Sequence, residues 1–313
     1  MNNEDLIFNY NKEVFGGTEY MAKNFHEKIL PYAKNFYKYN CLILPGQIED
    51  INSYIFDEKE IIVWLHNTPD QFHPGVNFIF YKKEFLEKIK YIVVVSEFAK
   101  TNLVLATGID PSKVVVIYNA IDPVQNNIER FKNVETVEIV HSSAHERGSF
   151  VLILALKYCK EDFKLNIYNQ LNPDIPFFNN QFKDITKDSR IYFYGRTSKK
   201  VLIKNLSQSH MYVYPSLFQE TFCLSQVEAL SANCLTIYNN LGSLKEVSLG
   251  FGISYDGIIN MEKHAQQLAK LIDINVKKIK TNNFNPENQN IIINDKFSWK
   301  NFENSWLKFN EII

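Results

Sequence analysis

Short apolar runs rich in β-branched and aromatic residues alternate with helical patterns along most of this chain of 313 residues. The runs are continuously apolar rather than alternating, which is typical of parallel strands that helices cover on both faces. A polar stretch separates them into two sets. Such runs begin at Leu6, Tyr39, Ile61, Tyr91 and Val114, and then at Val137, Lys164, Arg190, Met211, Cys234 and Gly250. The sequence therefore predicts an α/β protein with two doubly wound parallel sheets.

The predicted boundary between the two domains lies in the polar stretch Asp122–Val134. We assign residues 1–125 to the first domain and residues 126–296 to the second, sizes close to the usual ~150 residues. Ile274–Asn294 is polar and rich in asparagine, and we expect an irregular segment there. Residues 297–313 are expected to form an amphipathic helix that packs back on the first domain. Its apolar positions are Phe297, Phe302, Trp306, Phe309 and Ile312.

Composition excludes several classes of protein. The net charge of −1 gives no general attraction for nucleic acid or an anionic membrane. Four well-separated cysteines, Cys41, Cys159, Cys223 and Cys234, favour reduced thiols over disulfides or a zinc site. The start of the chain has no signal-peptide pattern, and no apolar run approaches 18 residues. We therefore expect a cytoplasmic protein without a transmembrane segment, for which peripheral membrane contact and the oligomeric state stay open.

The segment from Met211 to Val247 carries the strongest functional signal. A strand ends at Pro215 and Ser216, a loop leads to Glu220, and an amphipathic helix carries Glu228. These features meet at the carboxyl edge of a parallel sheet, where open α/β sheets bind ligands. We expect the helix to open at Thr221 and Phe222.

In that case the N–H groups of Phe222, Cys223 and Leu224 lack partners within the helix and suit a phosphate or a sugar. The Glu228 carboxylate would then be placed to hold vicinal hydroxyls such as those of a ribose. The alternative is that Glu220 and Glu228 are two solvated glutamates.

The motifs of this segment resemble those of the glycosyltransferases of family 4, which are retaining, metal-independent enzymes with a Glu-x7-Glu motif. The resemblance rests on Pro215-Ser216, Glu220-Thr-Phe-Cys, Glu228-Ala-Leu, Asn240-Leu-Gly242-Ser and Lys245-Glu246-Val. It extends along the chain to Phe15-Gly-Gly-Thr-Glu19, His66-Asn-Thr-Pro69, Ser96-Glu-Phe-Ala, Tyr118-Asn-Ala-Ile-Asp122 and Glu146-Arg-Gly148. It implies the GT-B fold, in which two Rossmann-like domains face a cleft. It also implies a nucleotide-diphosphate sugar as donor, a glycan or glycoconjugate as acceptor, and neither a cofactor nor a metal.

The resemblance also implies roles for individual residues. Glu220 would lie beside the donor sugar, Glu228 would hold the ribose, and Arg147 would bind the diphosphate. His66 would donate a hydrogen bond to a hydroxyl of the sugar or to the diphosphate. The leaving diphosphate would accept the proton of the acceptor hydroxyl. The remaining donor-binding residues would be Gly16, Gly17, Ser142, Ser143, Gly195, Arg196, Phe222, Cys223 and Leu224. For each of these residues an ordinary structural role is the alternative.

One position departs from the family pattern. The family usually has an arginine five residues before the diphosphate-binding cation, whereas this chain has Ser142, between His141 and Ser143. Arg196, Lys199 and Lys245 are the candidates for a second positive charge.

Two other functions stay open: a nucleotide-sugar epimerase or hydrolase, and a non-catalytic nucleotide-sugar-binding protein. The chain contains no Asp-x-Asp pair, dinucleotide-binding glycine motif, P-loop or nucleophile elbow. Metal-dependent GT-A transfer, hydride transfer, P-loop hydrolysis and α/β-hydrolase chemistry are therefore disfavoured.

Overall fold

The computed structural model describes residues 7–8, 16–44, 57–69, 71, 82–125, 127–144, 147–169 and 188–313. The chain forms two compact units, each composed of more than one stretch of sequence. The first unit contains the described residues up to Ile121, together with Glu220–Leu224 and Phe297–Ile313. The second contains Asp122–Gln219 and Ser225–Lys296.

The first unit is built on a parallel sheet with the strand order β1-β2-β3-β4. Its strands are β1 (Asn40–Leu44), β2 (Ile61–Leu65), β3 (Ile89–Val94) and β4 (Val114–Val116). Its helices are α1 (Gly17–Lys28), α3 (Lys83–Lys88), α4 (Glu97–Thr107) and α12 (Trp299–Ile312), with short 3-10 turns η2 (Leu30–Tyr32), η3 (Lys34–Lys38) and η5 (Pro111–Lys113). The capping pattern follows the sequence: the Ser96 hydroxyl accepts from the Ala99 amide, and Gly108 ends α4 in the left-handed conformation.

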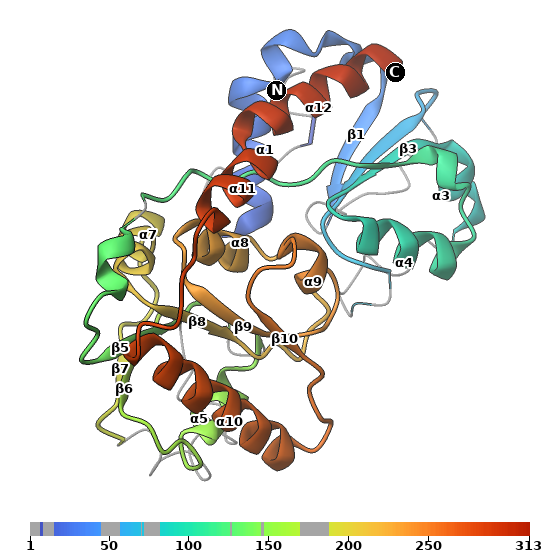
Figure 1. Cartoon of the computed structure of the whole chain (residues 1–313). Coiled ribbons are helices and arrows are strands. Elements are labelled where there is room, and N and C mark those ends of the chain that lie inside the picture. The colour runs from blue at the N-terminus through green and yellow to red at the C-terminus, as the bar shows by residue number, and fades with distance from the viewer. Residues whose placement is uncertain are drawn as a thin grey trace. The chain divides into compact units, whose positions relative to one another are not determined.

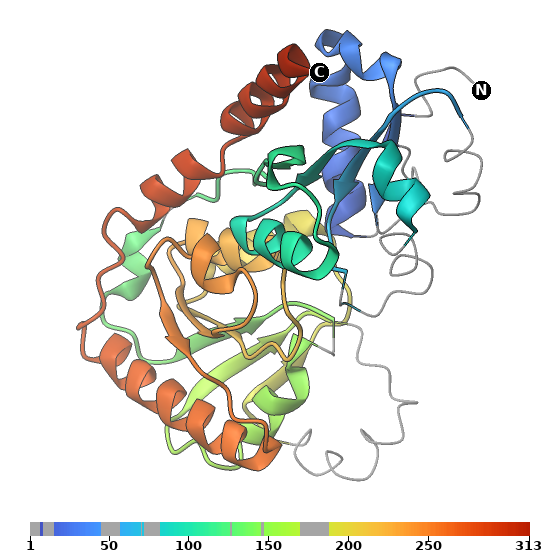
Figure 2. The ribbon, with the colours of Figure 1, turned by 90° about the vertical axis from the view of Figure 1, so that its right-hand side faces the viewer.

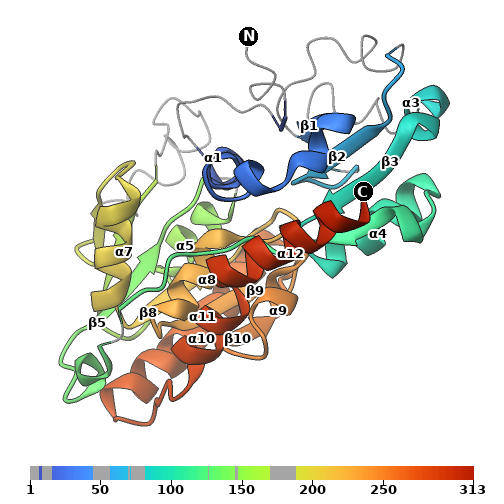
Figure 3. The same cartoon turned by 90° about the horizontal axis from the view of Figure 1, so that it is seen from above.

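The two faces of the first sheet have different cores. Aliphatic residues of the strands pack with Phe85 of α3 and Leu103 of α4 on one face. On the other face an aromatic cluster joins Trp64 of β2 to Phe25 of α1 and Trp306 of α12, with 4.8 Å between the ring centroids of Phe25 and Trp306. The last helix thus lies beside α1 and closes this face (Figure 3).

The second unit is built on a six-stranded parallel sheet with the order β10-β9-β8-β5-β6-β7. Counted within the unit, this is the 3-2-1-4-5-6 order of a Rossmann sheet read from β7 to β10. Its strands are β5 (Val137–His141), β6 (Phe163–Ile167), β7 (Ile191–Phe193), β8 (Met211–Tyr214), β9 (Leu235–Asn239) and β10 (Ile253–Tyr255). The strands β5, β6 and β7 follow one another toward one edge of the sheet, and β8, β9 and β10 follow one another toward the other edge. The direction of winding therefore changes between β5 and β8.

Helices lie on both faces of the second sheet (Figure 1). On one face, α5 (Ser149–Ala155) and α10 (Met261–Lys280) pack on the strands around an aliphatic core, and Figure 2 shows α10 running along the sheet. The other helices are α7 (Lys199–Gln208), α8 (Leu224–Ser231), α9 (Leu244–Val247) and α11 (Gln289–Lys296), with the turn η6 (Ile128–Phe131). The predicted class, an α/β protein with two parallel sheets, is confirmed.

Three local predictions need correction or limitation. The segment Ile274–Asn294 is largely helical, because α10 continues to Lys280 and α11 begins at Gln289. Ile312 is not on the buried face of α12, since 61% of its surface is exposed. Of the strand expected at Leu6, only Ile7 and Phe8 are among the described residues, and the Phe8 amide donates to the Cys41 carbonyl.

Candidate functional site

The carboxyl ends of β5 and β8 form the topological switch point of the second unit, which is where open α/β sheets bind ligands. Ser142 and Ser143 follow β5, and Pro215 follows β8. The Tyr212 hydroxyl donates to the Ser142 carbonyl at 3.2 Å, and the hydroxyls of Ser143 and Tyr214 are also 3.2 Å apart. Tyrosines of β8 therefore hold the loop after β5.

Arg147 and Gly148 end this loop. Gly148 has a φ of +90°, and a Cβ at this position would overlap the Pro215 carbonyl oxygen. Only glycine lets the two loops approach so closely. The Arg147 guanidinium lies 3.4 Å from the centroid of the Phe218 ring, a cation–π contact that keeps the positive charge at the switch point.

Glu228 is buried in the middle of α8 and forms an ion pair with Lys199, the first residue of α7. The Lys199 Nζ lies 2.9 Å from the Glu228 Oε1. Burial raises the pKa of Glu228, the charge of Lys199 opposes that rise, and Asp122 adds to it. The sequence suggested Lys199 only as a second cation for phosphate, and the 29 positions that separate it from Glu228 gave no sign of this pair.

Gly195 and Arg196 follow β7 at the same edge of the sheet. Gly195 has a φ of +67° and open space where a Cβ would lie, and Arg196 is exposed. Ser142, Ser143, Arg147, Gly195, Arg196 and Glu228 are thus all in the second unit.

The other predicted site residues lie in the first unit. Gly16 caps α1 in an extended conformation and Gly17 is its first residue. A Cβ on Gly17 would lie 2.9 Å from the Leu224 Cδ1, so the glycine permits close packing of the two segments.

His66 follows β2. Its carbonyl accepts a hydrogen bond of 2.6 Å from the Thr221 hydroxyl, and its ring lies against Trp64. Burial lowers the pKa of His66 to about 3, so the ring is neutral at pH 7. Its Nε2 is buried without a hydrogen-bond partner among the described residues.

The segment Glu220–Leu224 differs from the expectation in two ways. It belongs to the first unit, whereas the sequence pattern assigned it to the second domain. In addition, α8 begins at Leu224 rather than at Thr221, because Cys223 has a φ of 65° and so is left-handed. The first N–H groups of the helix are therefore those of Leu224 and the residues after it, not that of Phe222. Phe222 is buried against Phe297, and Glu220 is half-buried.

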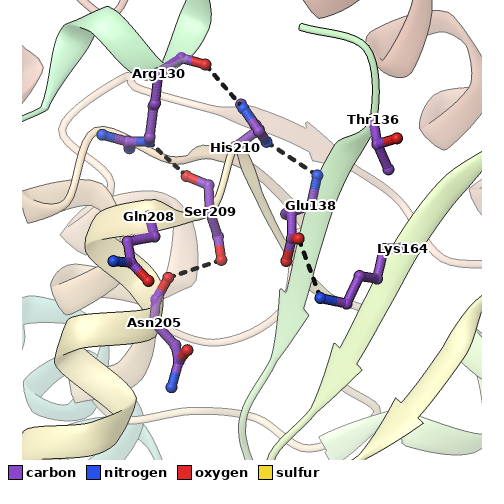
Figure 4. Close-up of a pocket in the computed structure, with 8 residues that line it drawn as sticks. All are labelled: Arg130, Thr136, Glu138, Lys164, Asn205, Gln208, Ser209 and His210. Atoms are coloured by element: carbon purple, nitrogen blue, oxygen red, sulfur yellow. Dashed lines mark hydrogen bonds and ion pairs between the residues drawn. The ribbon is translucent and has the colours of Figure 1, made fainter.

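A pocket of about 430 Å³ lies at the opposite, amino edge of the second sheet (Figure 4). Its charged groups are paired with one another or with the backbone: Lys164 lies 3.1 Å from Glu138, and the Arg130 Nε donates to the Ser209 carbonyl. His210 accepts from the Glu138 amide and donates to the Arg130 carbonyl. These contacts join η6, β5, β6 and the end of α7, so we assign this pocket a structural role.

No group of three or more histidine, cysteine, aspartate or glutamate side chains is arranged to hold a metal ion in the part of the chain that the structure describes. Within the same residues, no helix combines the length and the apolar character needed to cross a membrane.

Comparison with known proteins places the second unit in a family. Residues 123–291 match the sequence profile described as "Glycosyl transferases group 1", which is more than half of the chain. The chain is 26% identical over 216 residues to a subunit of the human phosphatidylinositol N-acetylglucosaminyltransferase, and 23% identical over 222 residues to the subunit of the same name from Arabidopsis thaliana. These matches cover 67% and 69% of this chain but only 43% and 47% of the relatives, so the matched region spans less than half of each relative.

Solved structures show the same fold. HepE from Anabaena, in complex with UDP and glucose, has a TM-score of 0.66 and 15% identity over 82% of this chain and 72% of its own. A glycosyltransferase from Rickettsia africae has a TM-score of 0.65 and 19% identity over 97% of this chain and 84% of its own. The pneumococcal O-GlcNAc transferase GtfA, in complex with UDP and GlcNAc, has a TM-score of 0.64 and 15% identity over 87% of this chain and 56% of its own. The expected GT-B fold is confirmed.

Proposed function

The chain belongs to the family of glycosyl transferases group 1, and we propose that it transfers a sugar from a nucleotide-diphosphate sugar to a hydroxyl of a glycan or glycoconjugate, with retention of anomeric configuration. We also propose that it belongs to family 4 within this group, with Glu220 and Glu228 as its Glu-x7-Glu pair. Transfer would need neither a metal nor a cofactor.

The arrangement at the switch point carries this proposal. Arg147 lies over Phe218 beside the glycine turn, and Glu228 is buried with Lys199 as its partner. A nucleoside diphosphate presents two kinds of group, anionic oxygens and ribose hydroxyls. A guanidinium suits the first and an ionised carboxylate the second. The family to which the chain belongs supplies the reaction class.

In the proposed reaction, Arg147 stabilises the negative charge that develops on the leaving diphosphate. Glu220 orients the donor sugar and stabilises its positively charged transition state. The neutral ring of His66, whose Nε2 has no hydrogen-bond partner in the described part of the chain, forms a hydrogen bond with the sugar or the diphosphate. The leaving diphosphate accepts the proton of the acceptor hydroxyl, so no glutamate needs to act as a covalent nucleophile.

The ligands bound in two similar structures indicate which donors to test first. HepE was solved with UDP and glucose, and GtfA with UDP and GlcNAc. We therefore propose a uridine nucleotide as the donor, with glucose or N-acetylglucosamine as the first sugars to test. The name of the human and Arabidopsis relatives makes a phosphatidylinositol the first acceptor to test.

Thermal unfolding with UDP, GDP, ADP and their sugars tests the donor class. A ligand at about 100 times its dissociation constant should stabilise the fold by about 2.7 kcal/mol. The absence of stabilisation by every nucleotide would contradict the proposal. Incubation of the stabilising donor without acceptor then separates the other functions, since a hydrolase releases free sugar and an epimerase releases an epimer.

The roles of the two glutamates are tested by calorimetry with UDP alone and by transfer rates. Glu228→Ala should weaken UDP binding because UDP contains the ribose. Glu220→Ala should leave UDP affinity nearly unchanged and lower turnover, because its proposed partner is the sugar. The reverse pattern would show that these roles are wrong even if the protein is a glycosyltransferase.

A further inference from the structure

Three buried polar side chains form a hydrogen-bonded series at the carboxyl ends of β5 and β6. They are His141, the last residue of β5, Ser149, the first residue of α5, and Asn169, two residues after β6. The exposed fractions of these residues are 0%, 0% and 6%. The proposed reaction uses none of them.

The direction of each hydrogen bond follows from the first. The His141 Nδ1 lies 2.9 Å from the Val213 carbonyl oxygen, which can only accept, so Nδ1 carries the proton. Burial lowers the pKa of His141 to about 4, so the ring is neutral at pH 7 and its Nε2 is an acceptor. The Ser149 hydroxyl, 2.9 Å away, must donate to it.

Ser149 in turn fixes the amide of Asn169. Because the hydroxyl proton points to His141, the Ser149 oxygen is left as an acceptor, and it receives the Asn169 Nδ2 at 2.8 Å. A flipped amide would place two acceptor oxygens against each other. The Asn169 Oδ1 therefore points away from Ser149.

The Asn169 Oδ1 is a hydrogen-bond acceptor, and none of the described residues donates a hydrogen bond to it. The atom is also buried. A buried hydrogen-bond acceptor without a partner destabilises the folded protein, because it has lost its hydrogen bonds to water. The structure thus maintains, through three residues, an unfavourable group in one fixed orientation.

Asn169 lies at the same edge of the sheet as the proposed binding site for the nucleotide sugar. β6 is the direct neighbour of β5, which ends at the switch point, and Asn169 follows β6 at the same edge of the sheet. On the other side, Tyr168 stacks on Tyr194 with 4.8 Å between the ring centroids, immediately before Gly195. Asn169 therefore follows the strand between β5 and β7, whose loops carry Arg147 and Arg196.

We propose that Asn169 is a specificity-determining residue of the donor site, whose Oδ1 accepts a hydrogen bond from an O–H or N–H of the nucleoside or sugar part of the donor. His141 and Ser149 are positioning residues that hold the amide. The diphosphate of the intact nucleotide sugar is excluded as the partner, because both of its phosphates are fully ionised at neutral pH and carry no proton to donate. This inference rests on the proposed function.

Calorimetry with Asn169→Leu tests the inference, with UDP, UDP-glucose, UDP-N-acetylglucosamine and inorganic pyrophosphate as probes. Without the Asn169 Oδ1, an O–H or N–H group of the bound ligand is left without a hydrogen-bond partner. This should weaken binding roughly 5- to 100-fold. Pyrophosphate affinity should not change. A loss already seen with UDP assigns the partner to the nucleoside, and a loss seen only with the nucleotide sugars assigns it to the sugar.

Asn166→Leu is the matched control. Asn166 lies within β6, and its buried Oδ1 also has no hydrogen-bond partner in the described part of the chain, but its Nδ2 donates to Glu138 beside the pocket at the amino edge. It should leave the affinity for every probe unchanged. If Asn169→Leu does not fold, Ser149→Ala keeps the test, because it frees the amide to rotate and should weaken nucleotide binding by a smaller factor.

The results separate this inference from the proposed function. If the wild-type protein binds no nucleotide diphosphate or nucleotide sugar, both are wrong. If it binds them and Asn169→Leu and Ser149→Ala bind equally well, only the inference is wrong. An equal loss for pyrophosphate would also overturn it, because a change of that kind is a general disturbance of the site.

Discussion

The ion pair between Glu228 and Lys199 makes the two residues dependent on each other. A carboxylate buried without its cation becomes protonated, because burial already raises the pKa of Glu228 and Lys199 opposes that rise. Lys199→Met should therefore weaken UDP binding about 10-fold by acting through Glu228. In a Glu228→Gln background the same change should have little further effect, since no carboxylate is left to hold.

Calorimetry of the two single variants and the double variant measures this coupling. Lys200→Met, which removes a neighbouring exposed lysine, is the control and should bind UDP as the wild type does. Losses that add fully in the double variant would mean that Lys199 contacts the nucleotide independently of Glu228.

His141 should make the stability of the protein depend on pH. The pKa of its ring is about 4 in the folded protein and 6.5 in its ordinary state. Above pH 6.5 the ring is neutral in both the folded and the unfolded chain, and stability does not depend on it. Between pH 6.5 and 4 the unfolded chain binds a proton that the folded protein does not, so stability falls as the pH falls, by about 3 kcal/mol at pH 4.

Urea unfolding of the wild type and His141→Gln between pH 7 and 4.5 measures this contribution. Glutamine does not titrate, so the variant should lose less stability over this range, and the other histidines cancel in the difference. Parallel stability curves for the two proteins would contradict the assignment.

Residues with charged side chains are easier to single out from the sequence than the contacts that they make. Glu220, Glu228 and Arg147 were singled out because charged groups in a short motif are visible in the sequence. The contacts of Lys199, Phe218 and Asn169 cannot be assigned in this way, because each joins residues that lie 20 or more positions apart in the chain. No local pattern encodes which lysine meets a buried glutamate.

At the scale of elements, the loop from β5 to α5 depends on Gly148. Alanine at this position would meet the Pro215 carbonyl and would also have to adopt a φ of +90°. Gly148→Ala should therefore displace the loop that carries Arg147, lower the free energy of unfolding and weaken UDP binding. Gly250 has a φ of +86° with nothing within 4 Å of a Cβ, so Gly250→Ala incurs only the conformational cost of about 1–2 kcal/mol.

Chemical denaturation and UDP calorimetry of the two variants separate the steric effect from the conformational one. Gly148→Ala should be the less stable variant and the only one with impaired binding. Equal stability and equal affinity would show that the loops can move apart without consequence.

Element boundaries were predicted less well than the elements themselves. Ile274–Asn294 is expected to be irregular because it is polar and rich in asparagine, yet Val276 and Ile279 lie at helical spacing and are both buried. The start of α8 was placed too early because a left-handed cysteine cannot be anticipated from residue type. Gln289, a polar residue in a predicted loop, instead donates to the backbone carbonyls of Leu230 and Cys234.

At the scale of the whole molecule, the strand pattern is sufficient to predict two parallel sheets, since every apolar run from Tyr39 onward contains a strand of one of them, whereas Ile7 and Phe8 of the run at Leu6 form a turn. The composition of the units from separate stretches was harder to predict. Glu220–Leu224 is counted with the first unit because its contacts, such as that of Thr221 with His66, are made there. A sequence pattern describes residues that are neighbours along the chain. It does not show that a short segment within the second domain packs with the first unit.

The proposed reaction as a whole requires that the protein itself neutralise the leaving diphosphate. Arg147 provides this charge, so transfer should continue in excess EDTA at a rate close to that without the chelator. Arg147→Ala removes a charge-assisted contact of ~1.5–3 kcal/mol and should lower transfer roughly 10- to 150-fold. Arg147→Lys keeps the charge and should lose less, and Lys157→Ala, an exposed cation elsewhere, should lose nothing. Transfer rates for these proteins with and without EDTA decide the point: complete loss in EDTA that only magnesium or manganese restores would mean that a metal ion, not Arg147, carries the diphosphate charge.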